Sequence, residues 1–179
     1  MPSGTGDFEL TTDELRVVAR YAVESAQEVL PIFEGVSPED LRPRAAIDAA
    51  WVFVNGGPRT RLQRVAALGS HRAAKEVDNE AARHAAQAAG DAAAAAYLHP
   101  LAKATQVGHI LRATANAAHA AELAGGDDAQ VTAVRVEKAR QLATPTLINV
   151  LRRYPEAPAG TSRVAQLMKT LDTSLRALR

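Results

Sequence analysis

Residues 81–123 read AARHAAQAAGDAAAAAYLHPLAKATQVGHILRATANAAHAAEL, and this alanine-rich stretch decides the fold. Alanine has the highest intrinsic helix propensity, and its small side chain lets neighbouring helices approach on several sides. The stretch therefore predicts two helices, of which the first is the central helix of the molecule. A proline breaks the helical hydrogen-bond pattern, so we expect the first helix to end or kink at Pro100. We expect the second to run from about Leu101 to Leu123.

Apolar residues recur at helical spacing through the rest of the chain, and strand alternation is nearly absent. We therefore predict an all-α protein, a multi-helix bundle or helical array of about eight helices with no sheet, in one domain over residues 1–179. Residues that commonly cap helices mark the expected starts, at Thr11 or Thr12, Ser37, Asp78 or Asn79, Asp128, Thr144 and Ser162.

Prolines and apolar stripes give more detailed expectations near the N-terminus. The first helix should bury Leu15, Val18, Ala22, Ala26, Val29, Leu30 and Phe33, and Pro31 should end or kink it. Pro38 should follow the Ser37 cap, and the next helix should carry Pro43 in its first turn. A third helix, from about Arg59 to Glu76, should turn one set of residues inward: Leu62, Val65, Ala66, Gly69 and Ala73.

Composition narrows the classes of function. The chain has no cysteine, which excludes disulfides, thiolate zinc sites and cysteine nucleophiles. Its net charge of +1 argues against nucleic-acid binding. It shows neither a secretory signal nor an apolar run long enough to span a membrane, so we expect a soluble, cytoplasmic protein. Nine acidic residues lie within residues 1–40, whereas the segment after Gly126 is basic. This asymmetry favours solvated faces at opposite ends of the molecule or, alternatively, a surface for a basic partner.

The histidines do not have the spacing of a metal site. A helix that holds one ion with two histidines places them three or four residues apart, whereas His109 and His119 are ten apart, which separates them by roughly 80° and 15 Å. His99 stands at the break before Pro100. His71 and His84 lie on other helices and can meet these residues only through the fold. From the sequence we predict no metal site and no cofactor.

The second helix of the quoted stretch carries a polar stripe formed by Lys103, Gln106, His109, Arg112, Asn116 and His119. The stripe is either a solvated face or a groove that receives a carboxylate or a backbone segment. It lacks a nucleophile paired with a base, so it indicates no reaction.

Two arginines flank Pro43 where the second helix begins. The helix dipole disfavours positive charge there, so Arg42 and Arg44 should have anionic partners. The candidates are Asp40, Asp48, glutamates of the first helix, or the carboxylates of a ligand.

Four blocks occur in an order that resembles one family: ELRVVARYAVESAQEVLPIFE, DLRPRAAIDAAWVF, ALGSHRAAKE and the quoted stretch itself. The chain is similar to the predicted all-α immunity proteins of bacterial polymorphic toxin systems. The resemblance implies a family-like core over residues 11–126 and a C-terminal helical extension over 127–179. The polar residues that match are Asp40, Arg42, Arg44, His71, His99 and His109. The chain departs from the pattern at GGPRTRLQRV, where a more acidic or neutral turn is expected.

The resemblance implies a non-catalytic cytoplasmic protein that neutralises a cognate toxin by direct contact. The candidate partner or ligand surface comprises Asp40, Arg42, Arg44, His71, His99, His109, Arg112 and Asn116. The alternative is a small-ligand-binding or enzymatic helical protein that uses the His109/Arg112/Asn116 stripe. A homodimer is compatible with either function.

Overall fold

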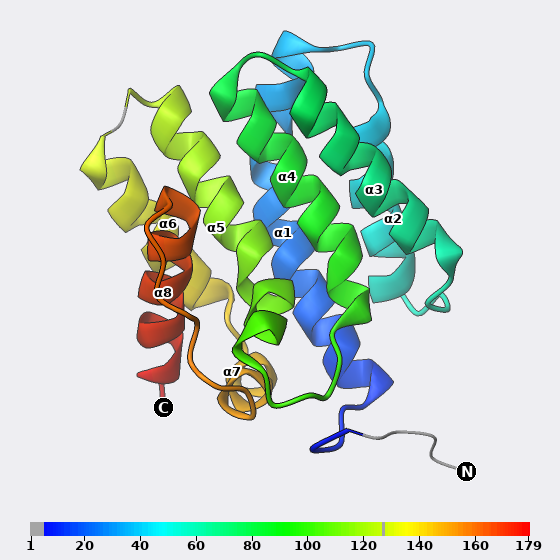
Figure 1. Ribbon diagram of the computed structural model, residues 1–179, viewed down its shortest axis with the longest axis vertical. Helices are drawn as coiled ribbons and strands as arrows, with labels where there is room; N and C mark the ends of the chain where they lie inside the picture. Colours follow the sequence, from blue (N-terminus) through cyan, green and yellow to red (C-terminus); the bar gives the residue numbers. More distant parts are fainter. Residues whose placement is uncertain (1–5, 127) are drawn as a thin grey trace.

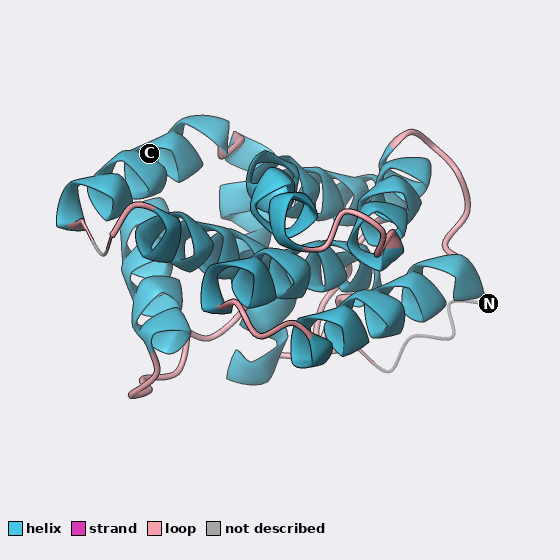
Figure 2. Ribbon diagram, turned by 90° about the horizontal axis from the view of Figure 1, so that it is seen from above, coloured by secondary structure: helices cyan, strands magenta, loops and turns pink. Residues whose placement is uncertain are grey.

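The computed structural model describes residues 6–126 and 128–179, and this part of the chain contains helices and loops but no strand (Figures 1 and 2). The prediction of an all-α fold of about eight helices is confirmed. Residues 1–5, on which the expectation of no secretory signal partly rests, and Asp127 lie outside the described residues. Among the described residues, no helix combines the length and the apolar character needed to cross a bilayer. The α-helices are α1 (Thr12–Val36), α2 (Arg42–Val54), α3 (Arg61–Glu76), α4 (Glu80–Ala94), α5 (Val107–Ala124), α6 (Ala129–Leu142), α7 (Pro145–Arg152) and α8 (Arg163–Arg176).

Helix α4 lies at the centre, as the alanine-rich sequence predicts. It contacts α1, α2, α3 and α5, and ten of its fifteen residues are buried, nearly all of them alanine. Figure 1 places α2 and α3 on one side of α1 and α4, and α6 and α8 on the other. Because alanine takes little room, four helices can pack around one without leaving cavities.

Most of the predicted helix starts are confirmed. Thr11 forms a capping box with Glu14, and Asn79, Asp128, Thr144 and Ser162 each accept a hydrogen bond from a backbone N–H in the first turn of the helix that follows. Thr60 makes a second capping box with Gln63, which the sequence analysis did not anticipate. These caps satisfy N–H groups that have no partner within the helix.

Helix α1 does not end at Pro31, and Ser37 does not cap the start of a helix. Helix α1 continues past Pro31 to Val36, because Leu30 and Phe33 are fully buried on either side of an exposed proline. Burial of such side chains outweighs the loss of one backbone hydrogen bond. Ser37 and Pro38 form a turn rather than a helix start, and α2 begins at Arg42 without a side-chain cap.

The second helix of the alanine-rich stretch starts later than predicted. After α4 the chain makes two short 3-10 turns, Ala95–Tyr97 and Ala104–Gln106, and α5 begins only at Val107. The segment between the turns is held by non-helical hydrogen bonds: Asp7 N–H donates to Pro100 O at 2.8 Å, and Ala102 N–H donates to the Asp7 carboxylate at 2.7 Å. Lys103 and Gln106 therefore lie outside α5 and are not part of a helical stripe.

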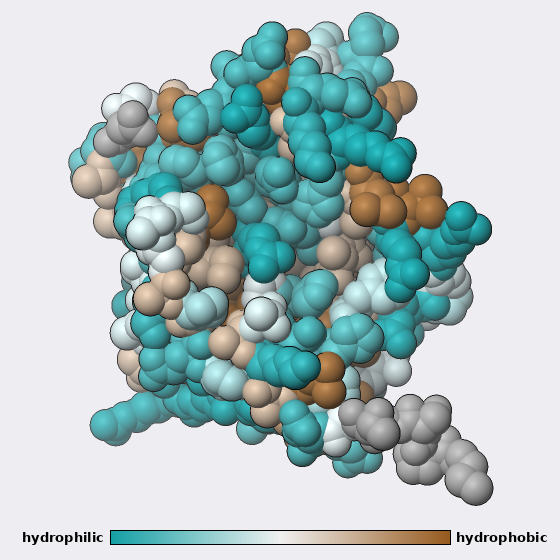
Figure 3. Space-filling view, viewed as in Figure 1, coloured by the Kyte–Doolittle hydropathy of each residue, from teal (hydrophilic) through white to brown (hydrophobic). Residues whose placement is uncertain are grey.

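Helix α3 is rotated relative to the prediction. Leu62 and Val65, expected inside, are 50% and 54% exposed. The inward side carries Gln63 and Ser70 instead, which donate hydrogen bonds to Ala49 O and Ala86 O. Small and hydrogen-bonded polar residues let α3 approach α2 and α4 closely, and the large apolar residues are left outside. Figure 3 shows hydrophobic atoms in brown where Figure 1 places α3.

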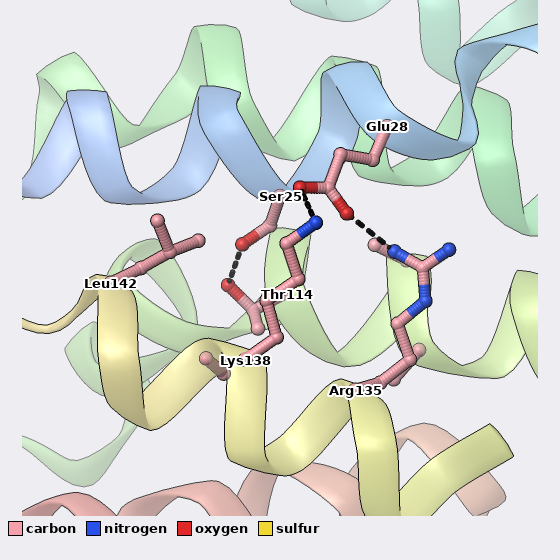
Figure 4. Close-up of a pocket in the computed structure, with 9 residues that line it drawn as sticks. Ser25, Glu28, Thr114, Arg135, Lys138 and Leu142 are labelled. Atoms are coloured by element: carbon pink, nitrogen blue, oxygen red, sulfur yellow. Dashed lines mark hydrogen bonds and ion pairs between the residues drawn. The ribbon is translucent and has the colours of Figure 1, made fainter.

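Two acids of the N-terminal segment, Glu14 and Glu28, pair with the basic C-terminal segment. Glu14 binds Arg153 at 2.5 Å, and Glu28 binds both Arg135 and Lys138 at 2.6 Å. Figure 4 shows the Glu28 pairs at the mouth of a small cavity between α1, α5 and α6. Six of the nine N-terminal acids form ion pairs, namely Asp13, Glu14, Glu24, Glu28, Glu34 and Asp40. Most of these acidic side chains are therefore paired with basic side chains of the same chain.

Candidate functional site

A series of polar side chains, joined by hydrogen bonds and ring or charge contacts, crosses the contact between α3, α4 and α5. We call it the polar network and define it by its members: His71, His84, Gln87, Asp91, Asn116, His119 and Glu122. Asp91, Asn116 and Glu122 are buried, at 7%, 4% and 5% exposure, and the other members are half-buried. Buried polar groups are costly unless they are paired, so these contacts fix how the three helices pack.

One end of the polar network joins α3 to α4. The His71 ring makes a 3.0 Å hydrogen bond through Nδ1 to Gln87 Oε1, and its Nε2 lies 3.6 Å from Asp91 Oδ1. Gly90 leaves room for the His71 ring against α4, because a Cβ at residue 90 would lie 2.7 Å from the ring. A side chain at residue 90 would therefore displace the imidazole from this position.

The carboxyl group of Asp91 has a strongly raised pKa. Burial raises the pKa of Asp91 to about 6, although the positive charges of His71 and Arg112 act in the opposite direction. Asn116 Nδ2 donates to Asp91 Oδ2 at 2.8 Å. The site therefore holds a carboxyl group that changes charge only about one pH unit below neutrality.

Asn116 links Asp91 to the histidine pair. Its amide nitrogen faces the carboxyl group of Asp91, so its amide oxygen faces His84 Nδ1, at 2.8 Å. The rings of His84 and His119 then meet edge to face, with centroids 4.4 Å apart. Burial lowers the pKa of His84, which favours the neutral ring.

Glu122 anchors the other end of the polar network to the C-terminal helices. It accepts a 2.9 Å hydrogen bond from His119 Nδ1, contacts the Thr132 hydroxyl, and forms a two-pronged ion pair with Arg163 of α8. The guanidinium of Arg163 is the main reason that the pKa of Glu122 falls to about 2. Charge-assisted pairing of this kind offsets the cost of burying the carboxylate.

The arginines at the start of α2 have protein partners. Arg42 binds Asp40 and Glu76, each at 2.6 Å, and Arg44 binds Glu34 of α1 through two hydrogen bonds of 2.9 Å. Two of the partners predicted from the sequence are found: Asp40 binds Arg42, and Glu34, a glutamate of the first helix, binds Arg44. Asp48 is not among these partners.

Comparison with known families decides the assignment. The chain matches the family described as "Imm-5 like putative immunity protein" over residues 9–145, about three quarters of its length. The chain belongs to this family. No curated protein and no solved structure gave a match.

Within this Imm-5-like chain, the matched residues extend from before α1 through α6. They include every member of the polar network, whereas Arg163, which pairs with Glu122, lies beyond them. The match also covers more of the chain than the core of residues 11–126 expected from the resemblance.

The structure divides the residues of the predicted surface into separate places. His71 and Asn116 meet through Asp91, and Arg112 is exposed beside them, with its guanidinium folded back over Gly108. His109 is half-buried and His99 is exposed outside the helices, where its backbone carbonyl accepts a 2.8 Å hydrogen bond from Tyr154. The predicted stripe is thus not one continuous polar groove.

Several members of the polar network were not predicted as site residues: Gln87, Asp91, His84, His119 and Glu122. Asp91 had a usable signal in the sequence, since a single acid inside the run AAGDAAAAA on a central helix must be buried. His84 and His119 were noted as histidines, but only the packing of α4 on α5 brings them together.

Proposed function

We propose that this Imm-5-like chain neutralises a cognate toxin protein by direct contact, without catalysis, in the cytoplasm. Family membership supports a role in immunity, and the outer face of α3 supports direct contact with a partner. Leu62, Val65 and Leu68 are about half exposed there, at 50%, 54% and 52%.

The outer face of α3 has the composition of a protein interface. Its three apolar residues stand at steps of three along one helix, and exposed basic residues flank them: Arg61, Arg64, Arg72 and Lys75. Interfaces combine an apolar centre with a polar rim, and arginine is enriched in them. This surface fits a toxin that presents an apolar patch bordered by acidic residues.

Arg42, one of the two predicted arginines, extends the same region. Arg42 reaches Glu76 at the end of α3, and its side chain lies 3.9 Å from the position of a Cβ at Gly69. A stable interface buries about 800 Å² on each partner, which is more than one short helix face offers. We therefore include Asp40, Arg42 and Arg44 in the proposed contact surface.

The alternative function, a small-ligand site or enzyme built on His109, Arg112 and Asn116, has less support. Asn116 is buried, its amide nitrogen donates to Asp91, and its amide oxygen accepts from His84. The cavity drawn in Figure 4 is lined by residues of α1, α5 and α6, and His109, Arg112 and Asn116 are not among them.

Capture followed by a growth assay tests the proposal. The full chain serves as bait in lysate of its source organism, beside a Val65→Asp/Leu68→Asp variant and a Val134→Asp control. Val134 is an exposed apolar residue of α6, at 61%, so the control places an aspartate on another face. Proteins that bind the wild type and the control but not the double variant are then expressed in a host, with and without this chain.

We expect one captured protein to arrest growth and the wild-type chain and the control to relieve the arrest, whereas the double variant does not. Captured proteins whose toxicity this chain leaves unchanged would contradict the proposed function.

A further inference from the structure

Helices α4 and α5 bring three metal-ligating side chains together where α4 begins. Glu80 and His84 are four residues apart on α4, so they share one face, and His119 of α5 packs against His84. One ligand atom from each of the three lies within 4.8 Å of the other two. This group lies at the exposed edge of the polar network, since Glu80 is exposed and both histidines are half-buried.

The hydrogen bonds behind the two rings determine which nitrogen is free. The Asn116 amide nitrogen donates to Asp91, so the Asn116 amide oxygen accepts a hydrogen bond from His84 Nδ1–H. The Glu122 carboxylate likewise accepts from His119 Nδ1. In a neutral ring with Nδ1–H, the lone pair is on Nε2, so both imidazoles are prepared as Nε2 ligands.

We propose that Glu80, His84 and His119 bind a zinc ion through two imidazole nitrogens and one carboxylate oxygen. Nitrogen and oxygen donors of this kind suit zinc, and three protein ligands leave a fourth position open to water or to a group from a partner. This inference is independent of the toxin-binding function.

The surroundings resemble the support that metal-bound histidines receive in general. Such histidines donate their second ring N–H to a carboxylate or carbonyl oxygen, which fixes the ring and raises its basicity. Here Asn116 and Glu122 have that role, and Asp91 and Arg163 hold them in turn. Tetrahedral zinc with bonds near 2.1 Å places its ligands about 3.4 Å apart, so the ion would draw the three side chains closer. The exposed carboxylate of Glu80 can make that movement.

Metal analysis of the full chain tests the site. The wild type is dialysed first against excess zinc chloride and then against metal-free buffer, and bound zinc is measured by elemental analysis. Glu80→Gln removes one ligand from an exposed position where folding is not at risk, and Asp78→Asn, also exposed, is the matched control. We expect one zinc per wild-type and control chain, and an affinity at least about tenfold lower in Glu80→Gln.

A second measurement needs no variant. Nitrogen NMR of the imidazole side chains in the wild-type chain should show zinc-induced shifts at Nε2 of His84 and His119, and none at His99, which is exposed and distant in sequence from both. Magnesium chloride should produce no shift. A wild-type chain that retains no zinc, or zinc that shifts other histidines while His84 and His119 stay unchanged, would overturn the assignment.

Discussion

The imidazole of His71 in α3 lies against the backbone of Gly90 in α4, in space that a side chain at position 90 would occupy. This contact lets His71 reach Gln87 and Asp91 on either side of the glycine. The alanine-rich helix therefore has one position where even alanine is too large.

Gly90→Ala should destabilise the chain even though alanine is the better helix former. The new methyl group would lie 2.7 Å from the His71 ring and would displace it from its hydrogen bond. We expect a loss of about 1–3 kcal/mol from overpacking, which exceeds the gain of about 1 kcal/mol from helix propensity. Chemical denaturation measures the difference. Gly69→Ala on α3 is the control, because its Cβ would meet ordinary contacts at 3.9 Å, and it should be neutral or stabilising.

The stability of the Asp91→Asn variant relative to the wild type should increase as pH rises. Because burial raises the pKa of Asp91 from 3.8 to about 6, the folded wild type must release a proton at a cost, and stability is lost as pH rises from about 4 to 6. The variant lacks this loss. We expect the unfolding free energy of the variant minus that of the wild type to increase by about 1–3 kcal/mol over this interval. A difference that stays constant or falls with pH would refute the assigned pKa.

Arg163→Met should leave the buried Glu122 carboxylate without its cation. The pKa of Glu122 is lowered from 4.5 to about 2, so its pairing stabilises the fold above pH 4.5 and is lost as pH falls toward 2. We expect a cost of about 1–3 kcal/mol at neutral pH and a weaker loss of stability in acid. Lys169→Met, also on α8, breaks an exposed pair with Glu156 of the preceding loop and should cost much less.

Arg44→Ala should weaken toxin neutralisation while leaving the stability of the fold nearly unchanged. The guanidinium of Arg44 binds Glu34, but both side chains are partly exposed, at 45% and 33%, so its removal should cost no more than about 1 kcal/mol. Toxin neutralisation should weaken, because Arg44 lies on the proposed contact surface. Full protection by the variant at an unchanged melting temperature would exclude Arg44 from that surface.

Local features of the sequence predicted the architecture well. The alanine content of residues 81–96 identified the central helix, and hydroxyl and carboxyl caps located most helix starts, because propensity and capping depend on near neighbours. That helix α1 does not end at Pro31 has the converse reason, since the burial of Leu30 and Phe33 is a tertiary effect that overrides a local penalty.

The candidate site was harder to predict, because its contacts join residues from different helices. Asp91 and Asn116 are 25 residues apart, and His84 and Asn116 are 32 apart, so spacing within one helix could not reveal either pair. The rotation of α3 was not predicted, because leucine and valine are more apolar than the small residues that actually face inward. The apolar pattern therefore assigned the wrong face to the core. A helix that packs against alanines can place those larger residues outside, where they are available to a partner.

Titration of the purified toxin with this chain tests the central claim most directly. Toxin activity is followed as the chain is added in increasing molar ratio and after different incubation times. Neutralisation by direct contact predicts that activity falls in proportion to the chain added, reaches its minimum at one chain per toxin, and does not change with further incubation. Loss of activity at far lower ratios that progresses with time would contradict the account, because it would mean that the chain turns over its target as an enzyme.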